Sequence, residues 1–196
     1  MVSYWDDEDN RRFRELIENV EHMSSENFIE KAKNGSPEMQ CRLAEYYFMC
    51  NLKREANEWY RRAADKDYLP AVEALAEYAE SYFRWDYVER AARLGSAYYN
   101  IVIGEEYLRE AMNLGHGYLS SSWEEQRQKA SLKALPYFER AAELGSGEAC
   151  YLLYKYYIGN CGGRFVDLHG KNTYEIACEY RDRALKLGYK PKNIEE

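Results

Sequence analysis

The residues whose chemistry could make this chain an enzyme lie in its C-terminal part: Cys150, Cys161, His169 and Cys178. A cysteine thiol becomes a nucleophile when a neighbouring base removes its proton, so Cys161 and His169 in the segment GNCGGRFVDLHGKN are a candidate pair. The pattern shows no third residue that would orient the histidine. We therefore expect no catalytic residue, and a hydrolase that uses Cys161 and His169 is the alternative.

The same four residues have side chains that zinc prefers, but their spacing does not favour a metal site. They follow the pattern C-x10-C-x7-H-x8-C, without the closely spaced ligand pair that zinc sites usually show. The fragment GSGEAC contains the first two glycines of a dinucleotide-binding loop but lacks the third, and a helical pattern precedes it where a strand is needed. The sequence thus predicts neither a metal nor a cofactor.

Acidic and phenolic side chains recur in pairs that could bind another protein. The pairs lie on segments with helical periodicity: Glu45 with Tyr46, Glu77 with Tyr78, Glu105 with Glu106, and Lys155 with Tyr156. Carboxylates form strong hydrogen bonds with arginine, and rigid tyrosine rings bury area with little loss of entropy. Apart from Lys155, these residues predict a binding surface for a basic protein partner. The alternative is that the glutamates are solvated helix formers and the tyrosines partly core residues.

The segments that carry these pairs belong to a repeated phrase. Residues 61–79, RRAADKDYLPAVEALAEYA, align with residues 139–157, ERAAELGSGEACYLLYKYY, and further copies occur elsewhere in the chain. The alignment gives one anchor residue to each copy, at spacings of 32, 28, 50 and 43 residues: Gly35, Asp67, Gly95, Gly145 and Gly188. A glycine at the anchor suits a left-handed helix cap, and the aspartate is the one substitute.

Small, apolar and aromatic residues on both sides of the anchors define the faces that the helices would bury. The helix before an anchor repeats small and aromatic residues: Ala56, Trp59, Ala63; Ala134, Tyr137, Ala141; and Ala177, Tyr180, Ala184. The helix after an anchor has two columns: Leu43, Leu75, Ile103 and Leu153, then Tyr47, Ala79, Tyr107 and Tyr157. Because one short helix pair cannot close a core alone, the pairs are predicted to stack as an all-α solenoid.

The domain organisation follows from this repeat. We expect capping helices in residues 1–34 and one continuous solenoid of about four helix pairs over residues 35–196. Residues 114–130 form an insertion in the third pair, which we expect to be a surface loop. Pro136 predicts a helix that restarts near Lys133 or is kinked there.

Three phrases resemble the Sel-1-like repeat family, which is related to the tetratricopeptide repeats: KNGSPEMQCRLAEYY, ANEWYRRAADKD and ALPYFERAAELGSGEACYLLYKYYIG. The resemblance covers roughly residues 24–188 and implies a right-handed superhelix with the first helix of each pair on its concave face. It also implies a protein-binding scaffold, and the form that we expect is a bacterial immunity-type inhibitor or an adaptor. A chaperone-type adaptor for peptide tails is a further alternative.

Composition and charge narrow the class of partner. The 34 acidic residues outnumber the 27 basic ones, and the formal net charge of −7 disfavours a nucleic-acid partner. No apolar run approaches the length of a membrane span, and the N-terminal MVSYWDDEDNRRF lacks the pattern of a secretory signal. We therefore expect a cytoplasmic protein without a membrane partner. Its five cysteines are expected to be reduced and mostly buried.

Overall fold

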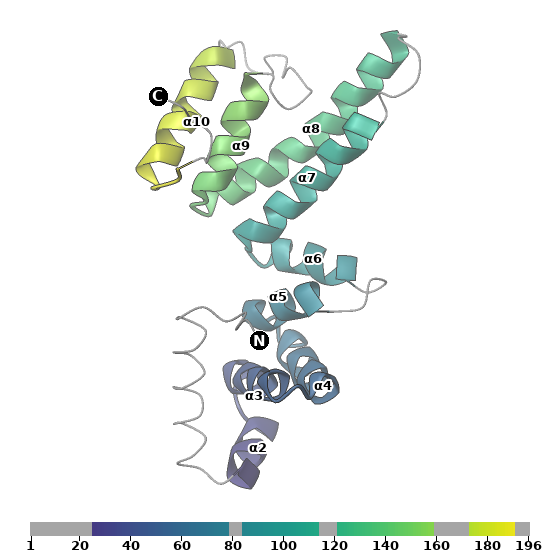
Figure 1. The fold of residues 1–196 in the computed structure, drawn as a ribbon, viewed down its shortest axis with the longest axis vertical. Coiled ribbons are helices and arrows are strands. Elements are labelled where there is room, and N and C mark those ends of the chain that lie inside the picture. The colour runs from purple at the N-terminus through teal and green to yellow at the C-terminus, as the bar shows by residue number, and fades with distance from the viewer. Residues whose placement is uncertain (1–24, 79–83, 114–120, 159–172, 191–196) are drawn as a thin grey trace, which may run out of the picture. The chain divides into compact units, whose positions relative to one another are not determined.

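Helices make up the regular structure of the described parts of the chain, residues 25–78, 84–113, 121–158 and 173–190, in this computed structural model. In chain order they are α2 (Ser25–Lys33), α3 (Pro37–Met49), α4 (Lys53–Ala64), α5 (Leu69–Tyr78), α6 (Arg84–Arg93), α7 (Ala97–Asn113), α8 (Ser121–Glu143), α9 (Gly147–Tyr157) and α10 (Thr173–Lys186) (Figure 1). These ranges contain no strand. The predicted all-α class is therefore confirmed for them.

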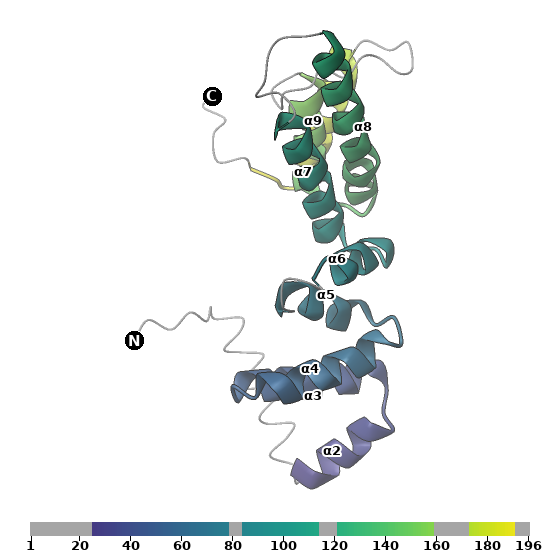
Figure 2. The same ribbon diagram turned by 90° about the vertical axis from the view of Figure 1, so that its right-hand side faces the viewer.

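The chain divides into two compact units, Met1–Tyr87 and Val88–Glu196. In the first unit α4 packs against α3 and α5, and Figure 2 shows α3 and α4 side by side. In the second unit α8 packs against α7 and α9, and α9 packs against α10. Within each unit, helices that are neighbours in the sequence are thus neighbours in space. The continuous solenoid and its handedness stay predictions.

The apolar columns predicted from the repeat are buried. This holds for the column after each anchor, Leu43, Leu75, Ile103 and Leu153. It also holds for the alanines of the preceding helices, Ala56, Ala63, Ala134, Ala141, Ala177 and Ala184. Tyr47, Tyr107 and Tyr157 are only half-buried, and Ala79 lies outside the described residues. Because the alanine side chains are small, the helices of a pair can approach closely while the leucines fill the space between them.

A residue in the left-handed region ends the helix at four of the five anchors. The φ angles are 56° at Asp67, 103° at Gly95, 89° at Gly145 and 77° at Gly188. The N–H of the following residue then donates to a carbonyl one turn back, for example Ser96 to Ala91 at 3.0 Å and Tyr189 to Ala184 at 3.1 Å. This is the Schellman arrangement. The predicted cap is confirmed at these four anchors.

Gly35 does not adopt the left-handed conformation that the alignment predicted. Its N–H donates to the carbonyl oxygen of Ala32 at 3.2 Å. A Cβ atom at Gly35 would lie 2.6 Å from the carbonyl oxygen of Lys31. Glycine is therefore required at this anchor by a close approach of the backbone and not by its φ angle.

The serine that follows an anchor glycine begins the next helix. Ser36 Oγ accepts a hydrogen bond from the N–H of Met39 at 3.3 Å, and Ser146 Oγ accepts one from the N–H of Ala149 at 3.2 Å. Such a side chain satisfies one of the helix N–H groups that have no partner within the helix. A Gly-Ser dipeptide in the repeat thus ends one helix and caps the next.

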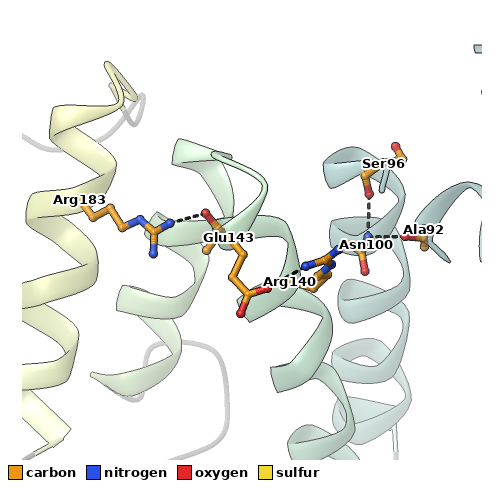
Figure 3. Close-up of polar contacts among 7 residues, drawn as sticks. Ala92, Ser96, Asn100, Arg140, Glu143 and Arg183 are labelled. Carbon is orange, nitrogen blue, oxygen red and sulfur yellow. Dashed lines mark hydrogen bonds and ion pairs between the residues drawn. The ribbon is translucent and has the colours of Figure 1, made fainter. Parts of the chain in front are cut away.

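Side chains complete the hydrogen bonding at two corners of the second unit. The Nδ2 atom of buried Asn100 donates to the carbonyl oxygens of Ala92 at 3.0 Å and of Ser96 at 2.7 Å (Figure 3). Cys150 occupies the equivalent place after Gly145. There Arg183 of α10 reaches across to donate to the carbonyl oxygen of Ala142 at 2.7 Å. At the two corners, the carbonyl group three residues before the anchor glycine thus accepts a hydrogen bond from a different side chain, Asn100 in one case and Arg183 in the other.

The predicted insertion is helical where the structure describes it. Helix α8 begins at Ser121, so residues 121–130 belong to this helix and are not a surface loop. Ala130 and Ser131 are buried. The helix also continues through Pro136, without the predicted restart near Lys133. Buried Ala134 and Phe138 lie on either side of the proline, so packing against neighbouring helices offsets the hydrogen bond that proline removes.

Candidate functional site

The residues predicted to bind a partner lie on the first helices of the helix pairs, α3, α5, α7 and α9. Their exposure differs. Glu77, Tyr78 and Glu105 are exposed. Glu45, Tyr46 and Glu106 are half-buried. Tyr156 has no exposed surface. On α3 and α5 of the first unit, and on α7 of the second, the predicted residues thus keep some exposed surface, whereas the tyrosine of α9 does not.

Tyr156 is a core residue, and its prediction as a contact for a partner is wrong. Its ring packs edge-on against Phe138 of α8, with 6.5 Å between the ring centroids. Tyr156 lies three residues after buried Leu153, so both side chains point to the same side of α9. For this tyrosine the alternative interpretation, a partly apolar core residue, is the correct one.

In the first unit, three helices place acidic and aromatic side chains around one phenol. This phenol is Tyr60 of α4, which is only 4% exposed. Burial raises the pKa of Tyr60, and Glu45 of α3 and Glu77 of α5 raise it further through their negative charge. The Tyr60 hydroxyl is therefore neutral and lies within the electrostatic reach of both carboxylates. We call Glu45, Phe48, Tyr60, Glu77 and Tyr78 the first-unit cluster.

Two aromatic rings connect α3 and α5 at this cluster. Phe48 of α3 and Tyr78 of α5 pack with 4.4 Å between their ring centroids and 32° between their planes. Phe48 is half-buried, whereas 43% of Tyr78 is exposed. An aromatic face therefore lies next to Glu77, its neighbour in the sequence. Such a face suits a flat or cationic group from a partner.

The carboxylate of Glu45 also interacts with Cys41, one helical turn earlier on α3. The Cys41 thiol donates to Glu45 Oε1 at 3.9 Å. Burial, followed by the charge and hydrogen bond of Glu45, raises the pKa of Cys41 to about 12. The thiol is therefore protonated at neutral pH and is a weak nucleophile. This contact helps to hold the Glu45 side chain on the α4 side of α3.

Tyr46, the neighbour of Glu45, is associated with a different group. The charge and hydrogen bond of the Cys50 thiol raise the pKa of Tyr46. The Tyr46 ring also packs edge-on against Tyr47, at 6.0 Å between centroids. Tyr46 therefore lies toward the C-terminal end of α3, and we do not include it in the first-unit cluster.

The predicted residues of the second unit have a different environment. Burial, and then the charge of Glu148, raise the pKa of Glu105. Glu106 forms an ion pair with Arg109 one turn later on α7. Lys155 Nζ lies over the ring of Tyr151, 5.9 Å from its centroid. Lys155 therefore stands in the column of Glu77, and the paired carboxylate of Glu106 stands in the column of Tyr78.

The alternative catalytic pair lies outside the described residues, since Cys161 and His169 both fall in residues 159–172. The four cysteines that the structure does describe are free thiols: Cys41 and Cys150 are buried, Cys178 is half-buried and Cys50 is exposed. Across the described ranges, no group of three or more His, Cys, Asp or Glu side chains could hold a metal ion. Nor is any helix in these ranges both long and apolar enough to cross a membrane.

Sequence reasoning missed two members of the first-unit cluster, Tyr60 and Phe48. Tyr60 lies seven residues before its anchor, where the second unit has buried Val88 and Phe138 and half-buried Arg181. Aligning the copies could therefore have identified Tyr60 as a core residue. It could also have shown that Tyr60 carries a hydroxyl group that Val88 and Phe138 lack. Phe48 has no such signal, because the equivalent residues differ in chemistry.

Comparison with known proteins does not assign the chain to a family. It matches no protein-family model, and no curated protein matches it.

Proposed function

We propose that this protein is a helical-repeat scaffold that binds a basic protein partner through the acidic and phenolic side chains on the first helices of its pairs. The observation that carries this proposal is the first-unit cluster. There, the charges of Glu45 and Glu77, from two separate helices, both raise the pKa of buried Tyr60, and the ring of Tyr78 is exposed. The residues that build the fold are other ones, chiefly alanines and leucines.

Charge complementarity supports a basic partner. The chain carries a formal net charge of −7, so it attracts basic proteins at long range. At the surface itself, carboxylates accept charge-assisted hydrogen bonds from arginine and lysine. Opposite charges speed up encounter and fix orientation, and an aromatic anchor slows dissociation. In the first unit, α3 and α5 offer both kinds of side chain.

We also propose membership in the Sel-1-like repeat family. The supporting observations are the repeated Gly-Ser corners, with their Schellman caps and serine caps, and the buried alanine and leucine columns. A scaffold of this kind can act as a stoichiometric inhibitor, such as an immunity protein, or as an adaptor. In both roles it binds its partner without catalysing a reaction.

The test is partner capture with charge-reversed variants. Glu45, Glu77 and Glu105 are replaced together by Lys, and the tagged protein is used to capture partners from host lysate. We expect capture to fall about tenfold or more, since each 1.4 kcal/mol is a factor of ten. The melting temperature should hardly change, because Lys and Glu have similar helix propensities.

The matched control is a second triple variant, with Glu55, Glu58 and Glu110 replaced by Lys. These exposed glutamates also place two changes in the first unit and one in the second, and they change the net charge equally. The control should keep the partner. Equal loss in both variants would show that net charge alone acts, and retention in both would refute the proposed surface.

A further inference from the structure

We infer that this chain self-associates through α10, which packs antiparallel against α10 of a second copy. The contact is made by four residues that lie three or four positions apart on one side of the helix: Tyr174, Cys178, Arg181 and Leu185. We call these four residues the α10 stripe. The inference goes beyond the proposed function and does not depend on it.

The first step is the side of α10 that is already occupied. Helices α8 and α10 each pack on the preceding helix through the same columns, which are Ala134, Tyr137 and Ala141 in α8 and Ala177, Tyr180 and Ala184 in α10. Tyr137 packs on Tyr107 of α7, with 5.7 Å between ring centroids. Tyr180 packs on Tyr157 of α9, with 5.8 Å between ring centroids. Helix α9 therefore covers the same side of α10 that α7 covers in α8.

The second step is a stripe of α8 that faces the next helix. Helix α9 lies between α8 and α10 (Figure 1). Phe138 of α8 packs on Tyr156 of α9, with 6.5 Å between ring centroids. One turn to either side of Phe138 on the same stripe, Leu135 is half-buried and Ala142 is buried, and Ser131 at the start of the stripe is also buried. In α8 this second stripe is therefore covered by the helix that follows.

The α10 stripe occupies the same columns, counted from the anchors Gly145 and Gly188, but it is open. The exposed fractions are 64% for Tyr174 and 53% for Leu185, and Cys178 and Arg181 are half-buried. Among the described helices, α10 packs against α9. The face that a further helix would cover is thus exposed in α10.

Leu185 also differs from its counterparts in size. The other copies have a buried alanine three residues before the anchor: Ala32, Ala64, Ala92 and Ala142. Because leucine is larger than alanine, a further repeat helix could not approach α10 as closely as α9 approaches α8. The leucine also adds apolar area to the exposed face, whereas a terminal repeat needs a polar outer face to be soluble alone. Both observations favour an occupant other than another copy of the repeat.

The α10 stripe is complementary to itself. Tyr174 and Leu185 lie at equal distances in sequence from the middle of the stripe, and so do Cys178 and Arg181. An antiparallel pair of α10 helices therefore places Tyr174 against Leu185 of the second copy, as a twofold contact requires. Arg181 forms an ion pair with Asp182 of its own helix at 2.9 Å, so its charge is compensated at this contact.

The charges beside the stripe match as well. Glu175 and Lys186 are exposed and lie on the same side of the stripe, near its two ends. In the antiparallel pair, Glu175 of each copy faces Lys186 of the other. The acidic and basic residues of α10 balance: Glu175, Glu179 and Asp182 against Arg181, Arg183 and Lys186. A neutral helix fits a second copy of itself better than it fits a basic partner, although the whole chain has a net charge of −7.

The experiment is sedimentation velocity of the whole chain over a series of protein concentrations at physiological ionic strength. The wild type should pass from monomer to dimer with a dissociation constant on the order of 10 to 100 μM, because one helix face is a small interface. A wild type that stays monomeric at about 1 mM would overturn the inference.

Leu185→Asp should weaken the association at least tenfold, since the dimer would bury an unpaired carboxylate from each copy. The matched control is Leu52→Asp, which changes a leucine of the first unit that is 44% exposed. The control should associate like the wild type. Association that survives Leu185→Asp, or that falls equally in both variants, would overturn the assignment to α10.

A charge exchange tests the antiparallel arrangement. Lys186→Glu replaces attraction by repulsion at both ends of the contact and should weaken association about threefold to tenfold. Adding Glu175→Lys to this variant should restore the wild-type dissociation constant. Residues 175 and 186 are about 16 Å apart along one helix, so the restoration must come from the second copy. A double variant that associates no more tightly than Lys186→Glu alone would overturn the antiparallel contact.

Discussion

The helix triplets α3–α4–α5 and α7–α8–α9 are built on the same repeat, yet they carry different chemistry. In the first triplet, Tyr60 lies near Glu45 and Glu77, and Tyr78 is exposed. In the second triplet, Phe138 takes the place of Tyr60 and packs against Tyr156, which is buried. The buried leucine and alanine columns of the two triplets are equivalent, so the difference lies in the aromatic residues between the helices and in the charged residues beside them.

This comparison separates two kinds of information in the sequence. The residues that recur, such as Leu75 and Leu153, pack the helices against one another and carry no information about the partner. The residues that differ between copies, such as Glu77 and Lys155, cannot be explained by packing, because each must be compatible with the same fold. A functional site in a repeat protein is therefore best sought where one copy departs from the others.

The largest effects are expected where the two triplets agree. Leu75→Ala and Leu153→Ala should each destabilise the protein by about 2 to 5 kcal/mol, because each leaves a cavity in a packed region. Urea denaturation of both variants measures the loss. Exposed Leu185 is the control, and its replacement by Ala should change stability by less than about 0.5 kcal/mol. Near-neutral values for both core variants would contradict the equivalence of the columns.

A smaller loss is expected at the helix corners. Gly145 has φ 89°, and a Cβ there would meet nothing within 4 Å, so only backbone strain opposes Gly145→Ala. We expect a loss of about 1 to 2 kcal/mol in thermal or urea unfolding. The matched change is Asp67→Asn at the corner with φ 56°, which should alter stability by less than about 0.5 kcal/mol, since asparagine tolerates this conformation. An equal loss at both corners would refute the role of the left-handed cap.

Stability should also fall at alkaline pH, because burial raises the pKa of several groups, among them buried Cys41 and half-buried Tyr157. Burial raises the pKa of Cys41 from 9.0 to about 12 and that of Tyr157 from 10.0 to about 12. A raised pKa in the folded state means that the stabilising contribution is complete below the unfolded value and is lost as pH rises through the folded value. Urea denaturation between about pH 8 and 11 should show this loss, and Cys41→Ala should reduce it, whereas Cys50→Ala should not. An unchanged slope in Cys41→Ala would contradict the assignment.

The smallest effect is a difference in thiol reactivity. Because only the thiolate reacts, exposed Cys50 should be alkylated faster than buried Cys41 and Cys150 in the native protein. Mass spectrometry of time points resolves the five sites. Cys161 is the informative exception: if it reacts much faster than Cys50, the hydrolase alternative gains support over the scaffold.

The all-α class and the packed helix pairs of the described residues were predictable from sequence because packing repeats itself. The buried leucine column and the left-handed caps at Asp67 and Gly95 followed from aligned phrases alone. The α7–α8 hairpin was not predictable in the same way. Its extra residues match no other copy, and the sequence from 121 to 130 was taken for a loop although it begins α8. Without a repeat to compare, contacts such as those of buried Ala130 leave no sequence signal.

The candidate site was only partly predictable. Helical spacing placed Glu45 and Glu77 on equivalent faces, but it could not show that both act on Tyr60, because this contact depends on the packing of α4 against both helices. Spacing also could not distinguish exposed Tyr78 from buried Tyr156, which occupy the same column. Each of them packs on a phenylalanine of another helix, Tyr78 on Phe48 and Tyr156 on Phe138, yet only Tyr156 is fully buried.

The most direct test exchanges the residue that differs most between the triplets. Glu77→Lys gives the first unit the charge of the second, and Lys155→Glu does the reverse. Both are measured by quantitative capture of the host partner, with melting temperature as the check of folding. Our account predicts that Glu77→Lys lowers capture about tenfold while Lys155→Glu retains it. Full capture by a folded Glu77→Lys variant would contradict the claim that the first-unit carboxylates bind the partner.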